Sequence, residues 1–254
     1  MVFSSLIFLY AFLPITFILY YIFPYRGYRN FILFAVSLVF YGWGEPKYIL
    51  VMLASILSAY FFGFFIEKYR DTDKRKARIF LTISLLANLS ALLIFKYTNF
   101  FVENISKLIP ALSGLTTNLV LPIGISFYTF QIMSYSIDVY RGDTRAQKNF
   151  IYFGAYVVLF PQLIAGPIVR YRDIEDMLTE RYESIEKFAS GVVRFCAGLA
   201  KKVILADSAA AVVEHYRLAN QFEPSVVGAW MVVLAYTFQI YFDFSGYSDM
   251  AIGL

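Results

Sequence analysis

The stretch Gln239-Ile-Tyr-Phe-Asp-Phe-Ser-Gly-Tyr-Ser-Asp-Met-Ala-Ile-Gly-Leu254 decides how the chain folds. It continues an uncharged apolar run that begins near Pro224, so its hydropathy places it in a bilayer, yet it carries Gln239, Asp243 and Asp249. A carboxylate at membrane depth costs roughly 2.5 to 3.5 kcal/mol on insertion scales, and it usually faces a cavity or a partner. The stretch therefore predicts one wall of a polar pocket inside the membrane.

The same stretch contains a predicted helix break. Gln239 and Asp243 are four residues apart and share a helix face, whereas Asp249 would point elsewhere on a straight helix. Ser245 and Gly246 lie between the two carboxylates, and such a pair is a common site of helix kinks. Broken helices at membrane depth occur where protein or a cavity covers the freed backbone. We expect the last helix to be interrupted there.

The composition of the 254 residues indicates a protein that crosses the membrane several times. The chain is 59% hydrophobic and 16% charged, whereas a soluble domain averages about 45–50% apolar and about 25% charged residues. Its net charge of +4 is modest and is explained by basic loops that anchor one side of the membrane. We therefore expect the lipid bilayer as a partner and no nucleic acid.

Hydrophobic segments follow one another without a linker, a second domain or an internal repeat. Each is bounded by charged or turn residues, and they are Met1–Tyr25, Asn30–Gly44, Tyr48–Ile66, Ile79–Phe95, Leu119–Ile137, Asn149–Val169, Ala189–Val213 and the run from Pro224. A membrane span needs about 20 apolar residues, so about seven or eight segments predict an all-α, polytopic transmembrane bundle. We expect residues 1–254 to form a single membrane domain that is incomplete at its C-terminus, because the chain stops in mid-segment.

A strongly basic loop sets the expected orientation. The segment Glu67–Arg78 holds six basic residues against three acids, and the positive-inside rule places such a loop in the cytoplasm. Counting back through two spans places the loop of Arg26 and Arg29 there as well, and the N-terminus outside. We expect a multi-pass protein of the cytoplasmic (inner) membrane with an uncleaved first span.

Three segments depart from a straight span and predict re-entrant or broken helices. Leu121-Pro-Ile-Gly124 opens the fifth span and should kink or shorten it. Phe160-Pro-Gln-Leu-Ile-Ala-Gly-Pro167 holds two prolines and a glycine, which favours a helix that ends within the membrane or a re-entrant segment. Charged residues interrupt Ala189–Val213, and two of them, Arg194 and Lys201, are seven apart on one helix face.

Together these segments resemble the membrane-bound O-acyltransferase superfamily, in the branch of alginate O-acetylation proteins and the related teichoic acid D-alanylation protein. The matching segments are Met1-Val-Phe-Ser-Ser5, Phe40-Tyr-Gly-Trp-Gly-Glu-Pro46, Leu121-Pro-Ile-Gly-Ile-Ser-Phe-Tyr-Thr-Phe-Gln131, Asp138-Val-Tyr-Arg-Gly142, Phe160-Pro-Gln-Leu-Ile-Ala-Gly-Pro-Ile-Val-Arg-Tyr-Arg-Asp173 and Gln239–Leu254. The resemblance implies helices around a central tunnel. It also implies transfer of an acyl group, such as acetyl, from a cytoplasmic thioester to an extracytoplasmic polysaccharide or a partner acetyltransferase. Acetyl-CoA or a carrier-protein thioester would then be a substrate, with no bound cofactor.

The resemblance implies as well that residues 1–254 lack the catalytic histidine of the family. That histidine lies beyond the aspartate–serine–glycine segment, and the sequence reaches Leu254 first. The single histidine, His215, matches no catalytic position of the family, and we interpret it as part of a loop over His215–Glu223. Acyl transfer needs a base, usually histidine. We therefore expect this chain by itself to be an inactive fragment with no catalytic residue and no metal ligands.

Two sets of residues are candidates for the site. The tunnel-lining candidates are polar residues of the apolar segments, namely Gln131, Gln162, Gln239, Asp243, Ser245 and Asp249. The alternative is structural: the two aspartates are paired, Gln239 forms an interhelical hydrogen bond, and Gln131 packs together with Tyr128. The donor-mouth candidates are basic residues that would meet phosphates of the thioester donor, namely Arg170, Arg172, Lys201 and Lys202. Their alternative is positive-inside anchoring.

A second class of function remains open at this stage. Intramembrane Asp243 and Asp249 beside broken helices would also suit an ion-coupled transporter or channel. Transporters of this kind are commonly built from repeated halves, and the sequence shows no such repeat. The acyltransferase interpretation is therefore preferred.

Overall fold

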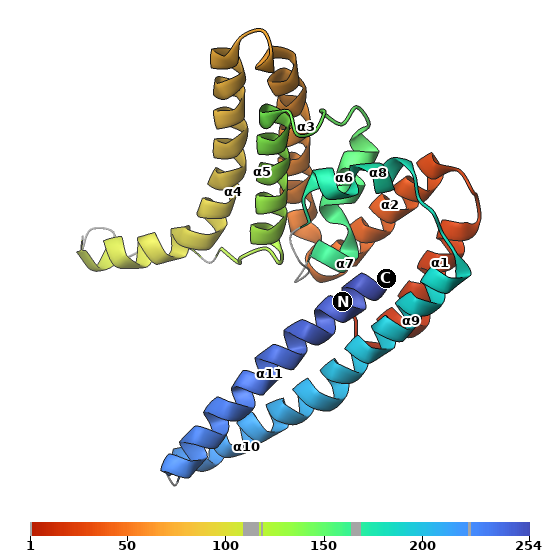
Figure 1. The fold of residues 1–254 in the computed structure, drawn as a ribbon. Helices are drawn as coiled ribbons and strands as arrows, with labels where there is room; N and C mark the ends of the chain where they lie inside the picture. The colour runs from red at the N-terminus through yellow and green to blue at the C-terminus, as the bar shows by residue number, and fades with distance from the viewer. Residues whose placement is uncertain (1, 109–116, 118, 164–168, 223–224) are drawn as a thin grey trace. The chain divides into compact units, whose positions relative to one another are not determined.

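A computed structural model provides the fold and describes residues 2–108, 117, 119–163, 169–222 and 225–254. Every regular element within these ranges is a helix (Figure 1), which confirms the predicted all-α class. The chain divides into two compact units. The smaller unit comprises Met1–Ile15 and Tyr182–Leu254, and the larger unit comprises Thr16–Ile164 and Ile168–Arg181.

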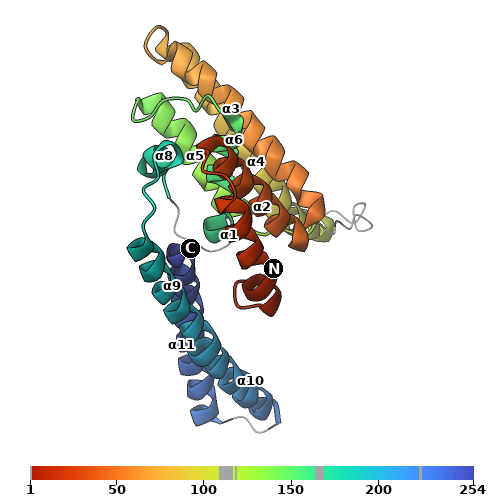
Figure 2. The same cartoon turned by 90° about the vertical axis from the view of Figure 1, so that its right-hand side faces the viewer.

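The larger unit is a set of helices that charged and turn residues delimit. In chain order these are α1 (Leu13–Tyr21), which begins in the smaller unit, α2 (Arg26–Gly44), a 3-10 turn (Pro46–Tyr48), α3 (Ile49–Arg70), α4 (Lys74–Leu108), α5 (Ile125–Arg141), α6 (Phe150–Val158), α7 (Phe160–Leu163) and α8 (Tyr171–Thr179). Helices α3, α4 and α5 pack side by side, and α6 packs on α2 and α3 (Figures 1 and 2).

The core of the larger unit is aromatic. Tyr135 of α5, Phe153 and Tyr156 of α6 and Tyr171 of α8 are fully buried. The ring centroids of Tyr135 and Phe153 are 4.4 Å apart, and Tyr171 lies 5.1 Å from Tyr135 and 5.2 Å from Tyr156. Tilted and edge-on arrangements of this kind are the favoured geometries of aromatic pairs. They fix α8 against α5 and α6.

Three helices in the described ranges are long and apolar enough to cross a membrane. They are Pro46–Arg70, Lys74–Lys107 and Val226–Gly253, and they confirm the predicted third, fourth and last spans. The first span was predicted too long, because the apolar helix there covers only Phe8–Tyr21 and opens with a π-helical stretch over Phe8–Phe12. Pro14 has no N–H with which to continue a regular hydrogen-bond ladder.

The predicted basic loop is mostly helical. Helix α3 runs to Arg70 and α4 begins at Lys74, so only three residues separate the two helices. The Asp73 carboxylate accepts hydrogen bonds of 3.1 Å from the backbone N–H groups of Arg75 and Lys76. An aspartate that accepts from these N–H groups is a favoured helix N-cap, and lysine and arginine are good helix formers. The basic residues therefore lie on the two helix ends.

Helix α4 extends beyond its predicted end at Phe95 and reaches Leu108. A single charge at Lys96 does not stop a helix, because lysine has a high helix propensity. Near the far end, Lys107 donates to Glu103 at 2.7 Å, which is an i, i+4 pair that supports helical structure. The remainder of the predicted interfacial segment, from residue 109, lies largely outside the described residues.

Helix α5 is shortened at its start, as predicted, although its bounds differ from Leu119–Ile137. It begins at Ile125, directly after Gly124, and ends at Arg141. Gly124 has φ = 74°, and a Cβ there would lie 2.7 Å from the backbone oxygen of Leu163. The left-handed conformation and the close backbone approach both require glycine. Because α5 ends at Arg141, the loop that was predicted over Asp138–Lys148 begins at Gly142, four residues later than predicted.

The predicted interruption within Asn149–Val169 is present. Helix α6 ends at Val158, the backbone leaves the helical region at Leu159, and the short α7 follows with Pro161 near its start. The Phe160 N–H, which the break frees, donates to the buried Ser37 hydroxyl at 3.1 Å. A freed backbone group at membrane depth needs such a partner. The re-entrant course expected after this point falls on residues 164–168, outside the described residues.

The C-terminal part of the smaller unit, from Tyr182, is an antiparallel pair of long helical segments (Figures 1 and 2). One segment runs through α9 (Ile185–Ala200), a π-helical turn (Lys201–Ala206) and α10 (Asp207–Phe222). The other is α11 (Val226–Gly253), which packs along all three elements. The segment predicted as the span Ala189–Val213 is thus part of a longer helix. The predicted loop at His215 is wrong, because His215 lies within α10.

The predicted break at Ser245 and Gly246 is also wrong, because α11 is one continuous helix through both residues. A glycine inside a helix costs only about 1 kcal/mol relative to alanine. The contacts that Gly246 makes with the facing helix offset that cost, as described below. Asp243 and Asp249 therefore lie on the same unbroken helix.

Candidate functional site

Paired glycines bring α9 and α11 into backbone contact. A Cβ on Gly198 would lie 2.6 Å from the backbone oxygen of Gly246, and a Cβ on Gly246 would lie 2.7 Å from that of Gly198. Gly191 and Gly253 repeat the arrangement, with distances of 2.5 and 2.6 Å. Small residues allow such close packing of membrane helices. The seven-residue spacing of glycines in both helices is the sequence signal of this contact, and our sequence analysis missed it.

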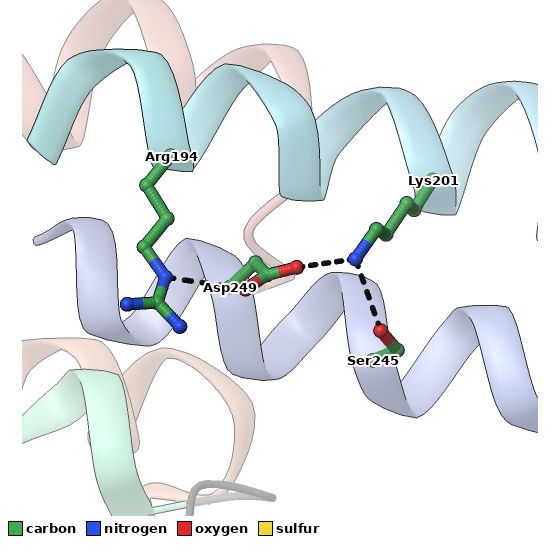
Figure 3. A network of polar contacts seen from close by, with 4 residues as sticks. All are labelled: Arg194, Lys201, Ser245 and Asp249. Carbon is green, nitrogen blue, oxygen red and sulfur yellow. Dashed lines mark hydrogen bonds and ion pairs between the residues drawn. The ribbon is translucent and has the colours of Figure 1, made fainter. Parts of the chain in front are cut away.

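Asp249 is held between two basic side chains of the facing segment (Figure 3). Lys201 donates to one carboxylate oxygen at 2.5 Å, and Arg194 Nε donates to the other at 3.2 Å. Lys201 also donates to the Ser245 hydroxyl at 3.2 Å. The Asp249 side chain is 21% exposed. This arrangement confirms that Arg194 and Lys201 share one helix face.

A second set of ion pairs forms around Lys202, the residue after Lys201. Lys202 Nζ is 3.0 Å from an Asp243 oxygen and 2.9 Å from an Asp207 oxygen. Three basic and three acidic side chains thus offset one another, with Asp207 on the same segment as Lys202 and the other two carboxylates on α11. Such mutual pairing is how ionisable residues are usually accommodated at membrane depth.

The π-helical turn presents both lysines to α11. Consecutive residues on a regular helix point about 100° apart at 3.6 residues per turn, yet Lys201 and Lys202 both contact carboxylates of α11. Gly246 lies between these contacts, since a Cβ on it would be 3.1 Å from Lys202 N and 3.3 Å from Lys201 Cβ. π-helical turns occur often at functional sites, and this one determines which carboxylate each lysine reaches.

The contacts limit what the two aspartates do chemically. A carboxylate that accepts hydrogen bonds from an ammonium or a guanidinium group is stabilised in its charged form and is a weaker base. Asp249 joins α11 to Arg194 of α9 and to Lys201, and Asp243 joins it to Lys202 of the π-helical turn. This pairing corresponds to the structural alternative raised from the sequence. Lining of a tunnel by Gln239, Asp243, Ser245 and Asp249 stays a prediction.

The glutamine candidates lie in different surroundings. Gln239 is half-buried on α11. Its side chain forms no hydrogen bond with any described residue, so the expected interhelical bond is not seen there. Gln162 donates to the backbone oxygen of Tyr156 at 2.6 Å and thereby closes the break between α6 and α7. Gln131 is buried on α5 near the fully buried Tyr128, whose hydroxyl has no hydrogen-bond partner among the described residues. Their role as tunnel lining stays a prediction.

The donor-mouth candidates divide between the two units. Arg170 is exposed just before α8, and Arg172 is 43% exposed, 3.9 Å from Asp143 and 3.5 Å from Asp173. Lys201 and Lys202 belong to the smaller unit, where carboxylates already neutralise both. Arg172 is thus paired with carboxylates as the two lysines are, and contact of any of the four with donor phosphates stays a prediction.

Asp138 is a buried acidic residue that is not among the site candidates predicted from the sequence. It lies in α5 at 5% exposure, and one of its carboxylate oxygens has no hydrogen-bond partner among the described residues. Burial raises the pKa of Asp138 above its ordinary value, and the nearby Arg172 and Arg170 offset only part of this effect. Its signal was an acidic residue within Asp138–Gly142, one of the segments that carry the family resemblance.

Comparison with known proteins identifies what the chain is similar to. Residues 143–254, which include α8 to α11 and all the ion pairs above, match the family model of the membrane-bound O-acyltransferases. All of the chain aligns at 44% identity with 51% of a probable alginate O-acetylase AlgI of Azotobacter vinelandii. It aligns at 33% identity with 53% of a peptidoglycan O-acetyltransferase of Helicobacter pylori. A teichoic acid D-alanyltransferase of Lacticaseibacillus rhamnosus is 25% identical over 84% of the chain and 51% of its own length. The chain spans about half the length of the curated relatives it matches.

Proposed function

Because this chain belongs to the membrane-bound O-acyltransferase family, we propose that the protein transfers an acyl group, most simply acetyl, across the cytoplasmic membrane. The donor is a cytoplasmic thioester, such as acetyl-CoA or an acyl carrier protein. The acceptor is a hydroxyl of an extracytoplasmic polysaccharide or a partner acetyltransferase. In this proposal the protein is a multi-pass protein of the inner membrane, with its N-terminus outside.

One observation carries the proposal: the whole chain aligns at 44% identity with an alginate O-acetylase. The names of other relatives support the polymer class, since they act on peptidoglycan and teichoic acid. The matched region contains the ion pairs of Asp243 and Asp249. We assign a structural role to these pairs: they hold α11 in a fixed register. Each carboxylate already has a basic side chain as its partner.

The base of the reaction lies outside the described site. Activation of an acceptor hydroxyl requires a positioned base, usually histidine, and in this proposal that histidine lies beyond residues 1–254. His215 lies within α10, where its ring packs edge-on against Tyr216 at 5.3 Å between ring centroids. In this proposal residues 1–254 shape the path of the acyl group and position the helix that precedes the base.

The transporter alternative gains no support from the geometry. It relied on intramembrane carboxylates that are available to bind and release an ion. Asp249 instead contacts Arg194 and Lys201, and Asp243 contacts Lys202. The helix that carries them is continuous, without the unwound backbone that coordinates ions in such transporters.

An acyl-transfer assay tests the proposal on membrane vesicles that contain the protein in its full natural length. Labelled acetyl-CoA and a labelled acetyl carrier protein are offered on the cytoplasmic side, and label is measured in polysaccharide and in protein. R170Q/R172Q should raise the donor KM more than about tenfold, since each lost charge-assisted hydrogen bond costs about 1.5–3 kcal/mol and 1.4 kcal/mol is a factor of ten, whereas R75Q/R78Q on α4 should not. Absence of transfer from either thioester, together with an ion flux that D243N abolishes, would overturn the proposal.

A further inference from the structure

The loop between α5 and α6, residues 142–148, is fixed to the helices around it. Arg70 of α3 donates to the backbone oxygen of Thr144 at 3.3 Å, and the Tyr135 hydroxyl of α5 accepts the N–H of Gln147 at 3.0 Å. Thr144 is only 5% exposed. Surface loops usually have few such contacts and are more mobile than the helices they join. This loop is instead a rigid part of the larger unit.

Two polar side chains of this loop hold α8 in place. The Thr144 hydroxyl donates to the Glu175 carboxylate at 2.5 Å, and the Gln147 side-chain nitrogen donates to the Tyr171 hydroxyl at 2.7 Å. The Gln147 amide is itself oriented, because its oxygen accepts the N–H of Asn149 at 3.0 Å. Tyr171 and Glu175 are four residues apart and share one face of α8. The two bonds therefore fix both the position and the rotation of this helix.

The anchored Tyr171 lies between Arg170 and Arg172 in the sequence. Its side chain is fully buried, and its ring packs at 5.1 Å from that of Tyr135 and at 5.2 Å from that of Tyr156. Arg170 and Arg172 are exposed on either side of it. Because Tyr171 cannot turn without leaving the core, its anchoring determines the direction in which both arginines leave the backbone.

The carboxylates near Arg172 hold it only at the surface. Its guanidinium lies 3.9 Å from the Asp143 carboxylate and 3.5 Å from that of Asp173, and all three side chains are 40% exposed or more. Exposed ion pairs of this kind contribute little. The bonds of Thr144 and Gln147, which act on buried groups of α8, are therefore the stronger constraints on where Arg172 lies.

We propose that Thr144 and Gln147 are positioning residues for the thioester donor. The inference rests on the proposed function, in which Arg170 and Arg172 meet the donor phosphates. Bidentate contact between arginine and phosphate requires a defined approach, and a helix that is already fixed reduces the ordering cost of binding. The phosphates of such donors lie far from the acyl carbon, so their contacts are equal in the ground state and the transition state. Their loss raises KM and leaves kcat unchanged.

The experiment measures donor KM and kcat in vesicles that contain the full-length protein, with the thioester that supports transfer. T144V/Y171F removes both hydroxyls that join the loop to α8 and keeps the shape of both side chains. Its control is T179V/Y41F. The Thr179 hydroxyl donates only to carbonyls of its own helix, and the buried Tyr41 hydroxyl has no hydrogen-bond partner among the described residues.

We expect T144V/Y171F to raise the donor KM about fivefold, with kcat and the KM of the control unchanged. A general loss of folded protein would instead lower kcat without changing KM. T144S keeps the hydroxyl and should behave as the unchanged protein does. If T144V/Y171F folds poorly, T144V with T144S as its rescue gives the same comparison.

A double-mutant cycle separates the positioning role from the donor contact. In the R170Q/R172Q background, T144V/Y171F should raise KM no further, because the side chains that it misplaces are gone. If R170Q/R172Q raises KM but T144V/Y171F does not, or if the two effects are additive, the positioning role is overturned and the donor contact stands. If R170Q/R172Q leaves KM unchanged, the donor contact is wrong and the positioning role falls with it.

Discussion

Gly198 of α9 and Gly246 of α11 meet backbone to backbone, so that a Cβ on either residue would lie within 2.7 Å of the backbone oxygen of the other. This contact sets the distance across which Lys201 and Lys202 reach the carboxylates of α11. The two glycines thus determine the geometry of the ion pairs. The glycine contact and the ion pairs can be perturbed by separate substitutions.

The first prediction concerns Gly246. G246A introduces a methyl group against backbone atoms that cannot rotate away, and overpacking of this kind costs about 1–3 kcal/mol. We expect a lower melting temperature of the purified protein and a weaker acyl-transfer rate. G44A is the control, because a Cβ on Gly44 meets nothing within 4 Å. Equal melting temperatures for the two variants would show that α9 and α11 are not in close contact.

The second prediction concerns the role of Asp249. D249N leaves Lys201 and Arg194 without their shared carboxylate, and removing one partner of such a pair is more harmful than removing both. We therefore expect D249N and K201M to be less stable than D249N/K201M, with a coupling of about 1 kcal/mol in a double-mutant cycle. The measurement is thermal unfolding together with acyl transfer.

Activity separates positioning from chemistry in these variants. If Asp249 only holds α11 in register, D249N/K201M should recover part of the transfer rate that D249N loses. If Asp249 itself exchanges a proton with substrate, the double variant should be as inactive as D249N, whatever its stability. The second outcome would contradict our assignment.

The third prediction concerns pH and the cap of α4. Hydrogen bonds from the backbone N–H groups of Lys76 and Arg75 lower the pKa of Asp73 below its ordinary value. Because the folded-state pKa is lowered, the cap stabilises the helix above the unfolded pKa of about 3.9 and is lost as pH falls through the lower folded value. The protection factors for amide hydrogen exchange in the first turn of α4, which are corrected for the intrinsic pH dependence of exchange, should therefore fall at acid pH and in D73A at neutral pH. D71A should leave exchange there unchanged, and equal effects would contradict the cap.

How much of this arrangement the sequence predicts depends on whether the signal is local. The break before Pro161 was predicted because proline and glycine act on their own backbone. The shared face of Arg194 and Lys201 was predicted because helical periodicity is local as well. The predicted break at Gly246 was wrong because this glycine allows α9 to pack closely against α11. A local sequence pattern does not show which helix packs against it. The π-helical turn at Lys201–Ala206 has no reliable composition signal, so the pairing of Lys202 with Asp243 was not foreseen.

The last prediction concerns the break between α6 and α7. The hydroxyl of Ser37 is fully buried and accepts the Phe160 N–H that the break frees. S37A leaves this N–H without an acceptor, and an unsatisfied buried donor costs about 1–3 kcal/mol. S58A is the matched control, since the buried Ser58 hydroxyl has no hydrogen-bond partner among the described residues, so its removal should be neutral or slightly stabilising. Melting temperatures of the two variants check the difference. A loss in S58A as large as that in S37A would mean that the serine hydroxyls act through packing, and that the interruption at Leu159 does not depend on its bond to α2.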